Sequence, residues 1–135
     1  MSTSLLALLG FISWTLLLLA LMEVLRSRLV VTGAVPANAF DPGNSGLSPF
    51  MQRLARAHAN CLEGLPVFGG LLLVAEVAGK SQVTDPLAYV FLAARIVQSL
   101  IHLASTSPAA VTARFTAFAV QIGVAMYWAV KLLGA

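Results

Sequence analysis

The feature that most constrains this chain is a series of four apolar runs, each long enough to cross a membrane. A bilayer core of about 30 Å requires about 20 helical residues. We predict spanning helices over residues 4–28, 51–78, 85–104 and 108–133. Of the 135 residues, 59% are hydrophobic and 10% are charged, so lipid is the expected solvent. The pattern predicts an all-α membrane protein in which residues 1–135 form a single four-transmembrane-helix bundle.

The first apolar run, Leu5 to Met22, carries no charge and could also be read as a secretory signal. No basic residue precedes it, and the small-residue site at 37–39 lies well beyond its end. We therefore expect a membrane anchor. The last run begins with Ser107 and Pro108, a capping residue and the residue favoured at the first helical position.

Basic residues are unequally distributed over the connections between the spans. With four spans, the first and third connections lie on one side, and the middle connection and both termini lie on the other. The first and third connections are bordered by Arg26, Arg28, Arg53, Arg56 and Arg114. The opposite side has Lys80 and Lys131 beside the acidic Glu76 and Asp85. The positive-inside rule therefore predicts that the first and third connections are cytosolic and that the termini face the opposite side.

The formal net charge of +3 does not indicate a nucleic-acid partner, because the eight basic residues are scattered among apolar runs. Cys61 is the single cysteine, which excludes an intramolecular disulfide and predicts a small buried side chain. The sequence contains no phosphate loop, zinc-ligand spacing or serine-nucleophile motif. We expect neither nucleic acid nor a metal ion as a partner.

The polar residues of the second and third spans each share one helix face. On the second span a sector of about 60° contains three of them, with a fourth beside it: Arg56, Asn60, Glu63 and Arg53. The third span has a similar set, Arg95, Gln98 and His102. Because the two spans are antiparallel and rise about 1.5 Å per residue, Glu63 and Arg95 lie within about one turn of the same depth. An unpaired charge near the centre of a span costs roughly 2.5–3.5 kcal/mol, so we predict that these two residues pair.

The sequence leaves two interpretations of these polar residues open. Polar groups inside a bundle can simply join helices, at about 0.6–2 kcal/mol per hydrogen bond. Alternatively, their donors exceed what one carboxylate can accept, which favours a small anionic ligand. His58, on the opposite side of the second span, is expected to pack against another helix or subunit. Pro66, with glycines nearby, is expected to bend this span or to let it pack closely.

The stretch Arg53 to Phe68, RLARAHANCLEGLPVF, closely resembles the second-helix signature of the membrane-associated proteins in eicosanoid and glutathione metabolism (MAPEG). The run from Ala94 to His102 is similar to the third-helix arginine motif of that family. Four spans and the chain length are also similar, so the resemblance covers essentially the whole chain.

The resemblance implies a homotrimer that binds glutathione as a co-substrate between neighbouring subunits, near the cytosolic face. It implies that Asn60 and Glu63 hold the glutathione backbone and that Arg95 supports Glu63. The remaining pocket residues would be Arg56, Arg53, Gln98 and His102.

The chain departs from the eicosanoid-producing members of the family at several positions. Those members tend to have a further arginine at the position of Ala59, and a histidine and a tyrosine where this chain has Gln98 and His102. They also resemble one another in an arginine near the start of the fourth span that is linked to thiol activation. The nearest basic residue in this chain is Arg114.

We therefore expect glutathione conjugation or peroxide reduction on lipophilic electrophiles that arrive through the bilayer, with Arg114 stabilising the reactive thiolate. Arg26 and Arg28 are candidates for clamping glutathione carboxylates, although a topological role alone accounts for them. One alternative is a non-catalytic relative that binds glutathione or a lipid, or serves as a membrane scaffold. Another is a proton- or solute-conducting bundle with a relay of Glu63, His102 and Arg95. The small size of the chain and the lack of a broken-helix pair or repeat argue against conduction.

Overall fold

The computed structural model describes residues 1–134. Its first span is α1, Thr3–Val31, and its third and fourth spans are α4, Ser81–Ala104, and α5, Pro108–Gly134. The second span consists of α2, Pro49–Gly64, the π-helical turn η1, Leu65–Gly69, and α3, Gly70–Val77. These four segments are long and apolar enough to cross a membrane, and the described residues form no strand. The predicted all-α fold with four spanning helices is therefore confirmed.

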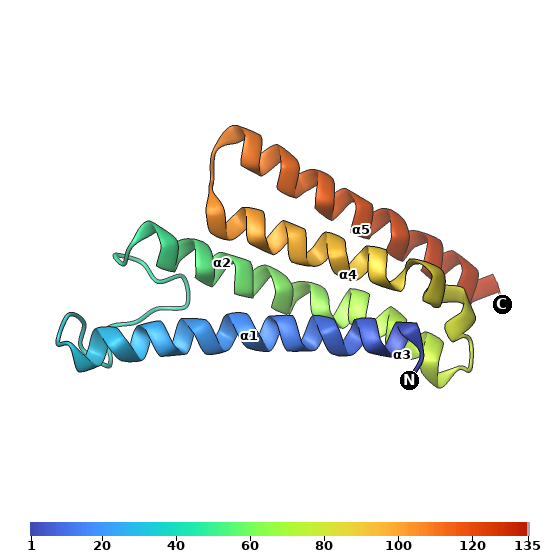
Figure 1. Ribbon diagram of the computed structural model, residues 1–135, viewed down its shortest axis with the longest axis horizontal. Helices are drawn as coiled ribbons and strands as arrows, with labels where there is room; N and C mark the ends of the chain where they lie inside the picture. Colours follow the sequence, from blue (N-terminus) through green and yellow to red (C-terminus); the bar gives the residue numbers. More distant parts are fainter. Residues whose placement is uncertain (135) are drawn as a thin grey trace.

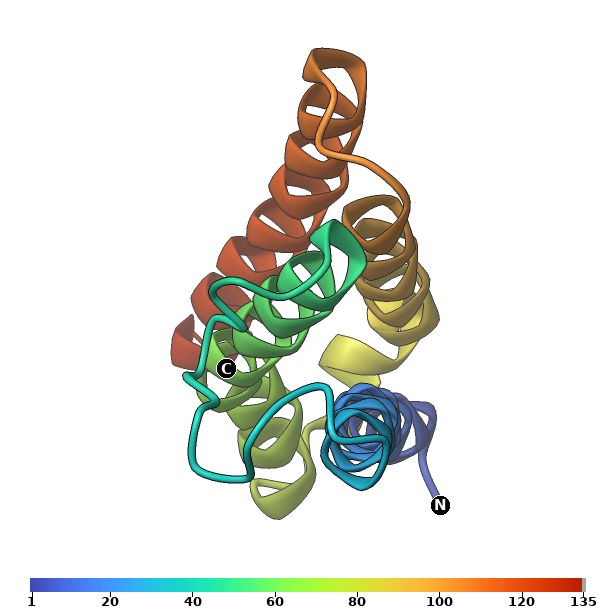
Figure 2. The ribbon, with the colours of Figure 1, turned by 90° about the vertical axis from the view of Figure 1, so that its left-hand side faces the viewer.

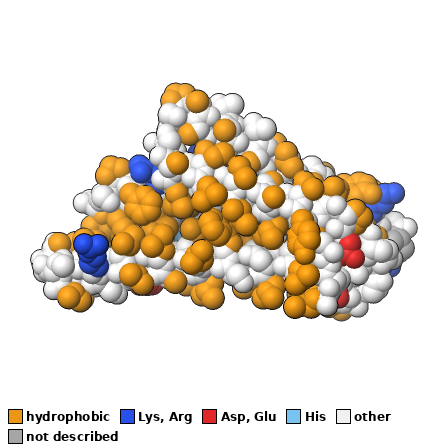
Figure 3. Space-filling model, in the orientation of Figure 1, with side chains coloured by type: hydrophobic (Ala, Val, Ile, Leu, Met, Phe, Trp, Pro, Cys, Tyr) orange, Lys and Arg blue, Asp and Glu red, His pale blue; other side chains and the backbone are white. Residues whose placement is uncertain are grey.

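The four spans run side by side along the long axis of the molecule (Figure 1). The connections after α1 and after α4 lie at one end, and the α3–α4 connection lies at the other end with both termini. The end-on view in Figure 2 shows α4 beside the other spans, and α4 packs against all of them. The face shown in Figure 3 is mainly hydrophobic, with its charged side chains toward the two ends. Such a distribution suits a chain surrounded by lipid along its middle.

The helices begin at capping residues that can be read in the sequence. Ser2 and Ser48 accept backbone N–H bonds at the starts of α1 and α2, and Ser107 accepts one from Ala110 at the start of α5. The third span begins at Ser81, four residues before the boundary expected from hydropathy. It includes Pro86, which removes only one backbone hydrogen bond so close to the helix start.

An aromatic cluster joins all four spans at the centre of the bundle. The ring centroid of Phe91 on α4 lies 5.7 Å from that of Phe11, 5.3 Å from that of Phe68 and 5.7 Å from that of Trp128. Phe11 belongs to α1, Phe68 to η1 and Trp128 to α5. Each such pair contributes about 0.5–1.5 kcal/mol beyond the burial of its area, so the cluster fixes how the spans pack.

The second span changes from α-helix to a π-helical turn at Leu65, directly before Pro66. Proline has no N–H to donate to the carbonyl of Leu62, which permits the wider turn. The turn directs Phe68 and Gly69 into the bundle, where both are buried. A side chain at Gly69 would place its Cβ 3.0 Å from Leu8 on α1, so the two spans approach closely there.

The loop between α1 and α2 folds back onto the helices around Asn44. This residue is buried, with a positive φ of 56°. Its Nδ2 donates to the carbonyl oxygen of Met51 at 2.7 Å, and its Oδ1 accepts from Arg26 Nε at 2.9 Å and Nη2 at 2.6 Å. Beside it, hydrogen bonds from the Ser45 side chain and backbone hold the pKa of Asp41 below its ordinary value.

Candidate functional site

The polar stripe of α2 lies on a face of the second span that its own chain leaves open. Arg56 and Glu63 are exposed, and Asn60 is half-buried. Within residues 1–134, neither Arg56 nor Glu63 makes a hydrogen bond or an ion pair. Both lie inside a membrane-spanning segment, where such exposure is costly.

Arg95 on α4 is a buried cation without a carboxylate partner. It is only 1% exposed, and its guanidinium carbon lies 5.4 Å from the Phe11 ring centroid, 5.6 Å from Phe68 and 6.0 Å from Phe118. These cation–π contacts contribute about 0.5–2 kcal/mol each. They leave Nε and Nη2 without a hydrogen-bond acceptor in the described part of the chain. Arg95 can therefore serve an acceptor that enters from outside the fold.

The predicted ion pair between Glu63 and Arg95 is absent from the described residues, so that prediction is wrong for the single chain. The two residues do line the same inner cavity, of about 280 Å³, with Asn60, Gly64, Val67, Phe68 and Phe118. The guanidinium is held among the aromatic rings, while Glu63 lies on the open face of α2. The approach of Arg95 depends on Gly64, because a Cβ there would lie 2.8 Å from Nη2.

An outer cavity of about 230 Å³ adjoins the inner one and lies closer to the α4–α5 connection. It is lined by Asn60, Gln98, His102, Val111, Arg114, Phe115 and Phe118. The two cavities share Asn60 and Phe118. Arg114 and Arg56 both act electrostatically on His102, and no acidic residue lines this outer cavity. It therefore offers donors and positive charge to a ligand.

Gln121 on α5 is a polar residue of this region that the sequence analysis missed. It is fully buried, and its Nε2 donates to Gln98 Oε1 at 2.8 Å and to the carbonyl oxygen of Ala117 at 3.1 Å. The available signal was a lone amide in an otherwise apolar span, which is rarely without a function or a partner.

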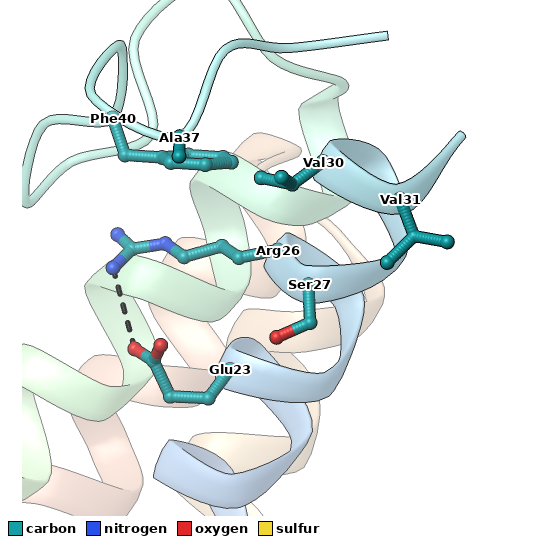
Figure 4. Close-up of a pocket in the computed structure, with 7 residues that line it drawn as sticks. All are labelled: Glu23, Arg26, Ser27, Val30, Val31, Ala37 and Phe40. Atoms are coloured by element: carbon teal, nitrogen blue, oxygen red, sulfur yellow. Dashed lines mark hydrogen bonds and ion pairs between the residues drawn. The ribbon is translucent and has the colours of Figure 1, made fainter. Parts of the chain in front are cut away.

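Four of the expected site residues line neither cavity in the single chain: Arg56, on the open face of α2, and Arg26, Arg28 and Arg53. Arg53 Nε donates to the carbonyl oxygen of Leu103 at 2.8 Å and so satisfies the end of α4. Arg28 lines a cavity between the end of α1 and the start of α2. Arg26 is held by the loop, as described above, and its Nη1 lies 3.4 Å from Glu23 Oε1 (Figure 4).

The cavity at Arg26 is separate from the two that adjoin Asn60. Its walls combine Glu23, Arg26 and Ser27 with the apolar Val30, Val31, Ala37 and Phe40 (Figure 4). On the neighbouring face of α2, His58 is half-buried and interacts electrostatically with Arg26 and Glu23. Cys61 is fully buried and contacts the Ser99 hydroxyl, as a small core side chain does.

Comparison with models of protein families decides what kind of protein contains these cavities. Residues 4–134 match the MAPEG family. The chain belongs to the MAPEG family. Searches of curated proteins and of solved structures each gave no match. The MAPEG family includes glutathione transferases and peroxidases as well as non-catalytic members, and its members are typically oligomeric integral membrane proteins.

Proposed function

We propose that this MAPEG protein is a membrane-bound glutathione-dependent transferase or peroxidase that acts on lipophilic electrophiles. Glutathione has two carboxylates, an ammonium group and a thiol, and the thiolate is its nucleophilic form. The thiolate would attack an electrophilic carbon and expel its leaving group. Alternatively, it would attack a peroxide oxygen and release an alcohol, and a second glutathione would convert the resulting sulfenic acid to glutathione disulfide and water.

The observation that carries the proposal is the donor-rich outer cavity beside Arg95. No carboxylate of the described residues lines that cavity, and two nitrogen atoms of Arg95, Nε and Nη2, lack an acceptor. A ligand with carboxylates would supply the missing acceptors. A ligand ammonium would in turn pair with Glu63, which has no partner in the described chain. Glutathione has both kinds of group.

We assign the ligand contacts by position in the two cavities. Asn60 belongs to both cavities and would hold the peptide backbone of glutathione, with Glu63 on its ammonium and Arg95 on an acceptor oxygen. Gln98 and His102 would complete the polar wall of the outer cavity. Arg56 lines neither cavity within its own chain and would act from the open face of α2. Arg114, half-buried in the outer cavity, would stabilise the thiolate as a fixed positive charge.

The site is completed by neighbouring subunits of a homotrimer in this proposal. Each cavity is smaller than the about 300–1,000 Å³ that is usual for ligand sites. Leaving Arg56 and Glu63 in lipid would cost roughly 2.5–3.5 kcal/mol each, so a second copy of the chain that covers α2 removes a large penalty. Arg26, Arg28 and Arg53 do not reach the cavities within their own chain and would act from the neighbouring subunit or through the loop and the end of α4.

The lipophilic electrophile would enter from the bilayer through the inner cavity. Its walls include Val67, Phe68 and Phe118, and Val67 is exposed on the lipid-facing side of η1. We further propose that the α1–α2 and α4–α5 connections are cytosolic, so that soluble glutathione reaches the outer cavity from that side.

The test is to purify the protein in detergent and measure glutathione binding and its conjugation to a chlorinated dinitrobenzene. Arg56→Ala should weaken binding, and Arg114→Ala should lower kcat more than it changes the Kd for glutathione. Lys131→Ala, which removes a cation at the far end of α5, is the matched control. Wild-type protein that does not bind glutathione would refute the proposal, and unchanged kcat in Arg114→Ala would remove this residue from the mechanism.

A non-catalytic glutathione-binding member is the second candidate. Arg114 makes no hydrogen bond within residues 1–134, so the described chain does not fix its guanidinium against a thiolate. Glutathione binding without turnover of any electrophile or peroxide would favour this candidate. Proton flux through proteoliposomes would instead indicate a conducting bundle. The positions of Glu63 and His102 in different cavities do not favour a relay between them.

A further inference from the structure

We propose that Gln121 is a positioning residue that fixes the amide of Gln98 with its N–H groups toward the outer cavity. The inference rests on the proposed function, because it explains how a neutral side chain at position 98 comes to favour the carboxylate or carbonyl oxygens of glutathione. Gln98 lines the cavity, whereas Gln121 does not.

The orientation of the pair follows from one backbone group. The carbonyl oxygen of Ala117 can only accept a hydrogen bond, so the Gln121 atom 3.1 Å from it must be the amide nitrogen. The second hydrogen of this nitrogen points to Gln98 at 2.8 Å, where it requires an acceptor. The Gln98 atom at that position is therefore Oε1, and its amide nitrogen lies on the other side.

This arrangement determines what Gln98 can offer a ligand. Its oxygen is occupied by Gln121, and its Nε2 donates to no residue within 1–134. Gln121 Oε1 is fully enclosed and has no hydrogen-bond partner among the described residues. Gln98 Nε2 also has no partner among them, but it is not fully enclosed and remains accessible from the outer cavity. An amide free to rotate would accept or donate equally well, whereas this one only donates. The wall at position 98 therefore favours oxygen acceptors over ammonium groups.

Burial makes the preference strong. Gln121 is 0% exposed and Gln98 is 3% exposed, so water cannot replace either hydrogen bond. Rotating Gln98 would set two amide nitrogens against each other, and rotating Gln121 as well would set its oxygen against the Ala117 carbonyl. Each alternative adds a repulsive contact and loses a hydrogen bond, whereas the observed arrangement leaves only Gln121 Oε1 of this amide pair buried without a partner among the described residues.

A double-mutant cycle on the full-length protein in detergent tests the inference. Isothermal calorimetry would give the Kd for glutathione in wild type, Gln121→Met, Gln98→Met and the double variant. We expect Gln121→Met to weaken binding about tenfold, because a donor to a charged oxygen is no longer held in place. In the Gln98→Met background the same change should have no further effect, since the residue acts through Gln98.

Gln121→Glu is a second variant of nearly the same size, and it decides the matter if the methionine variant does not fold. A glutamate supplies at most one hydrogen for the two acceptors, so its Kd should also rise. Val120→Met, on the exposed side of the same helix, is the control and should leave the Kd unchanged. Equal effects of Gln121→Met in both backgrounds would overturn the inference while leaving the proposed function intact. No binding by wild type would instead overturn both.

Discussion

Two polar clusters form where other segments of the chain meet different parts of α4. They differ in whether the chain satisfies the hydrogen-bonding groups of the cluster. The terminal cluster, near the start of α4, consists of Ser2, Ser4, Glu76, Thr84 and Asp85. Its Asp85 Oδ1 accepts from the Ser4 backbone N–H at 2.8 Å and from the Ser4 hydroxyl at 2.6 Å. The Ser4 hydroxyl also contacts that of Thr84, and the Ser2 hydroxyl donates to Glu76 at 2.5 Å.

The cavity cluster, in the opposite half of the bundle, consists of Arg56, Asn60, Glu63, Arg95, Gln98, His102 and Arg114. Here Glu63 has no partner among the described residues, and two nitrogen atoms of Arg95, Nε and Nη2, lack an acceptor. A buried polar group left unsatisfied costs about 1–3 kcal/mol. Folding of the single chain therefore accounts for the terminal cluster, whereas it leaves in the cavity cluster groups that the proposed ligand and second subunit would satisfy.

The largest expected effect is on binding at the cavity cluster. Glu63→Gln removes the only carboxylate that lines the inner cavity. Losing one member of a charge pair that the proposed subunit interface buries costs about 2–5 kcal/mol, so we expect the Kd for glutathione to rise at least about 30-fold. The midpoint of thermal unfolding without ligand should not fall, because Glu63 has no partner among the described residues to lose. Calorimetry and a thermal scan measure the two quantities, and a large loss of ligand-free stability would break the comparison.

The terminal cluster should show the reverse behaviour. Asp85→Ala leaves the Ser4 N–H and hydroxyl without their shared acceptor. We expect a loss of about 2–3 kcal/mol in the free energy of unfolding, measured by denaturant titration in detergent. The Kd for glutathione should stay at the wild-type value. Glu23→Ala, which removes an exposed carboxylate that forms a 3.4 Å surface ion pair with Arg26, serves as the control for charge. A weakened Kd in Asp85→Ala would show that the two clusters are not independent.

A smaller effect is expected where the cavity cluster meets the core. Gly64→Ala would place a Cβ 2.8 Å from Arg95 Nη2 and 3.1 Å from Phe68 Cδ2. Such overpacking should cost about 1–2 kcal/mol of stability and displace Arg95 from the inner cavity. Gly70→Ala is a matched control six residues along the same span, because a Cβ there meets nothing within 4 Å. Equal stability of the two variants would mean that the approach of Arg95 does not depend on Gly64.

The features that could be predicted from the sequence are those that depend on local spacing along the chain. Hydropathy alone identifies the four spans, because an apolar run of bilayer length has few alternatives. The family resemblance and helical periodicity place Asn60 and Glu63 on one face of α2, and the structure sets both at the same cavity. These inferences depend only on local spacing.

Contacts that depend on rotamers and on packing between spans could not be predicted in the same way. Depth matching brought Glu63 and Arg95 to one level but not into contact, because Phe11, Phe68 and Phe118 surround the guanidinium. The pairing of Gln121 with Gln98 requires the rotation of α5 about its axis, which hydropathy does not report. Hydropathy also does not reveal that Arg26 donates a hydrogen bond to Asn44 in the loop.

The smallest expected effect concerns a third polar region, the exposed turn of the loop at Asp41, whose hydrogen bonds are made within the chain but in water. Bonds from Ser45 lower the pKa of Asp41 below 3.8, so the ionised carboxylate is favoured by the folded loop. Its contribution is present above that ordinary value and is lost as the pH falls through the lowered pKa. We expect the hydrogen-exchange protection factor of the Ser45 amide to fall as the pH is lowered from above 3.8 through the lowered pKa of Asp41. Asp41→Asn should show a lower protection factor that does not vary over this range. If the wild-type factor were equally constant, water would already have replaced the bond, and the loop would resemble neither cluster.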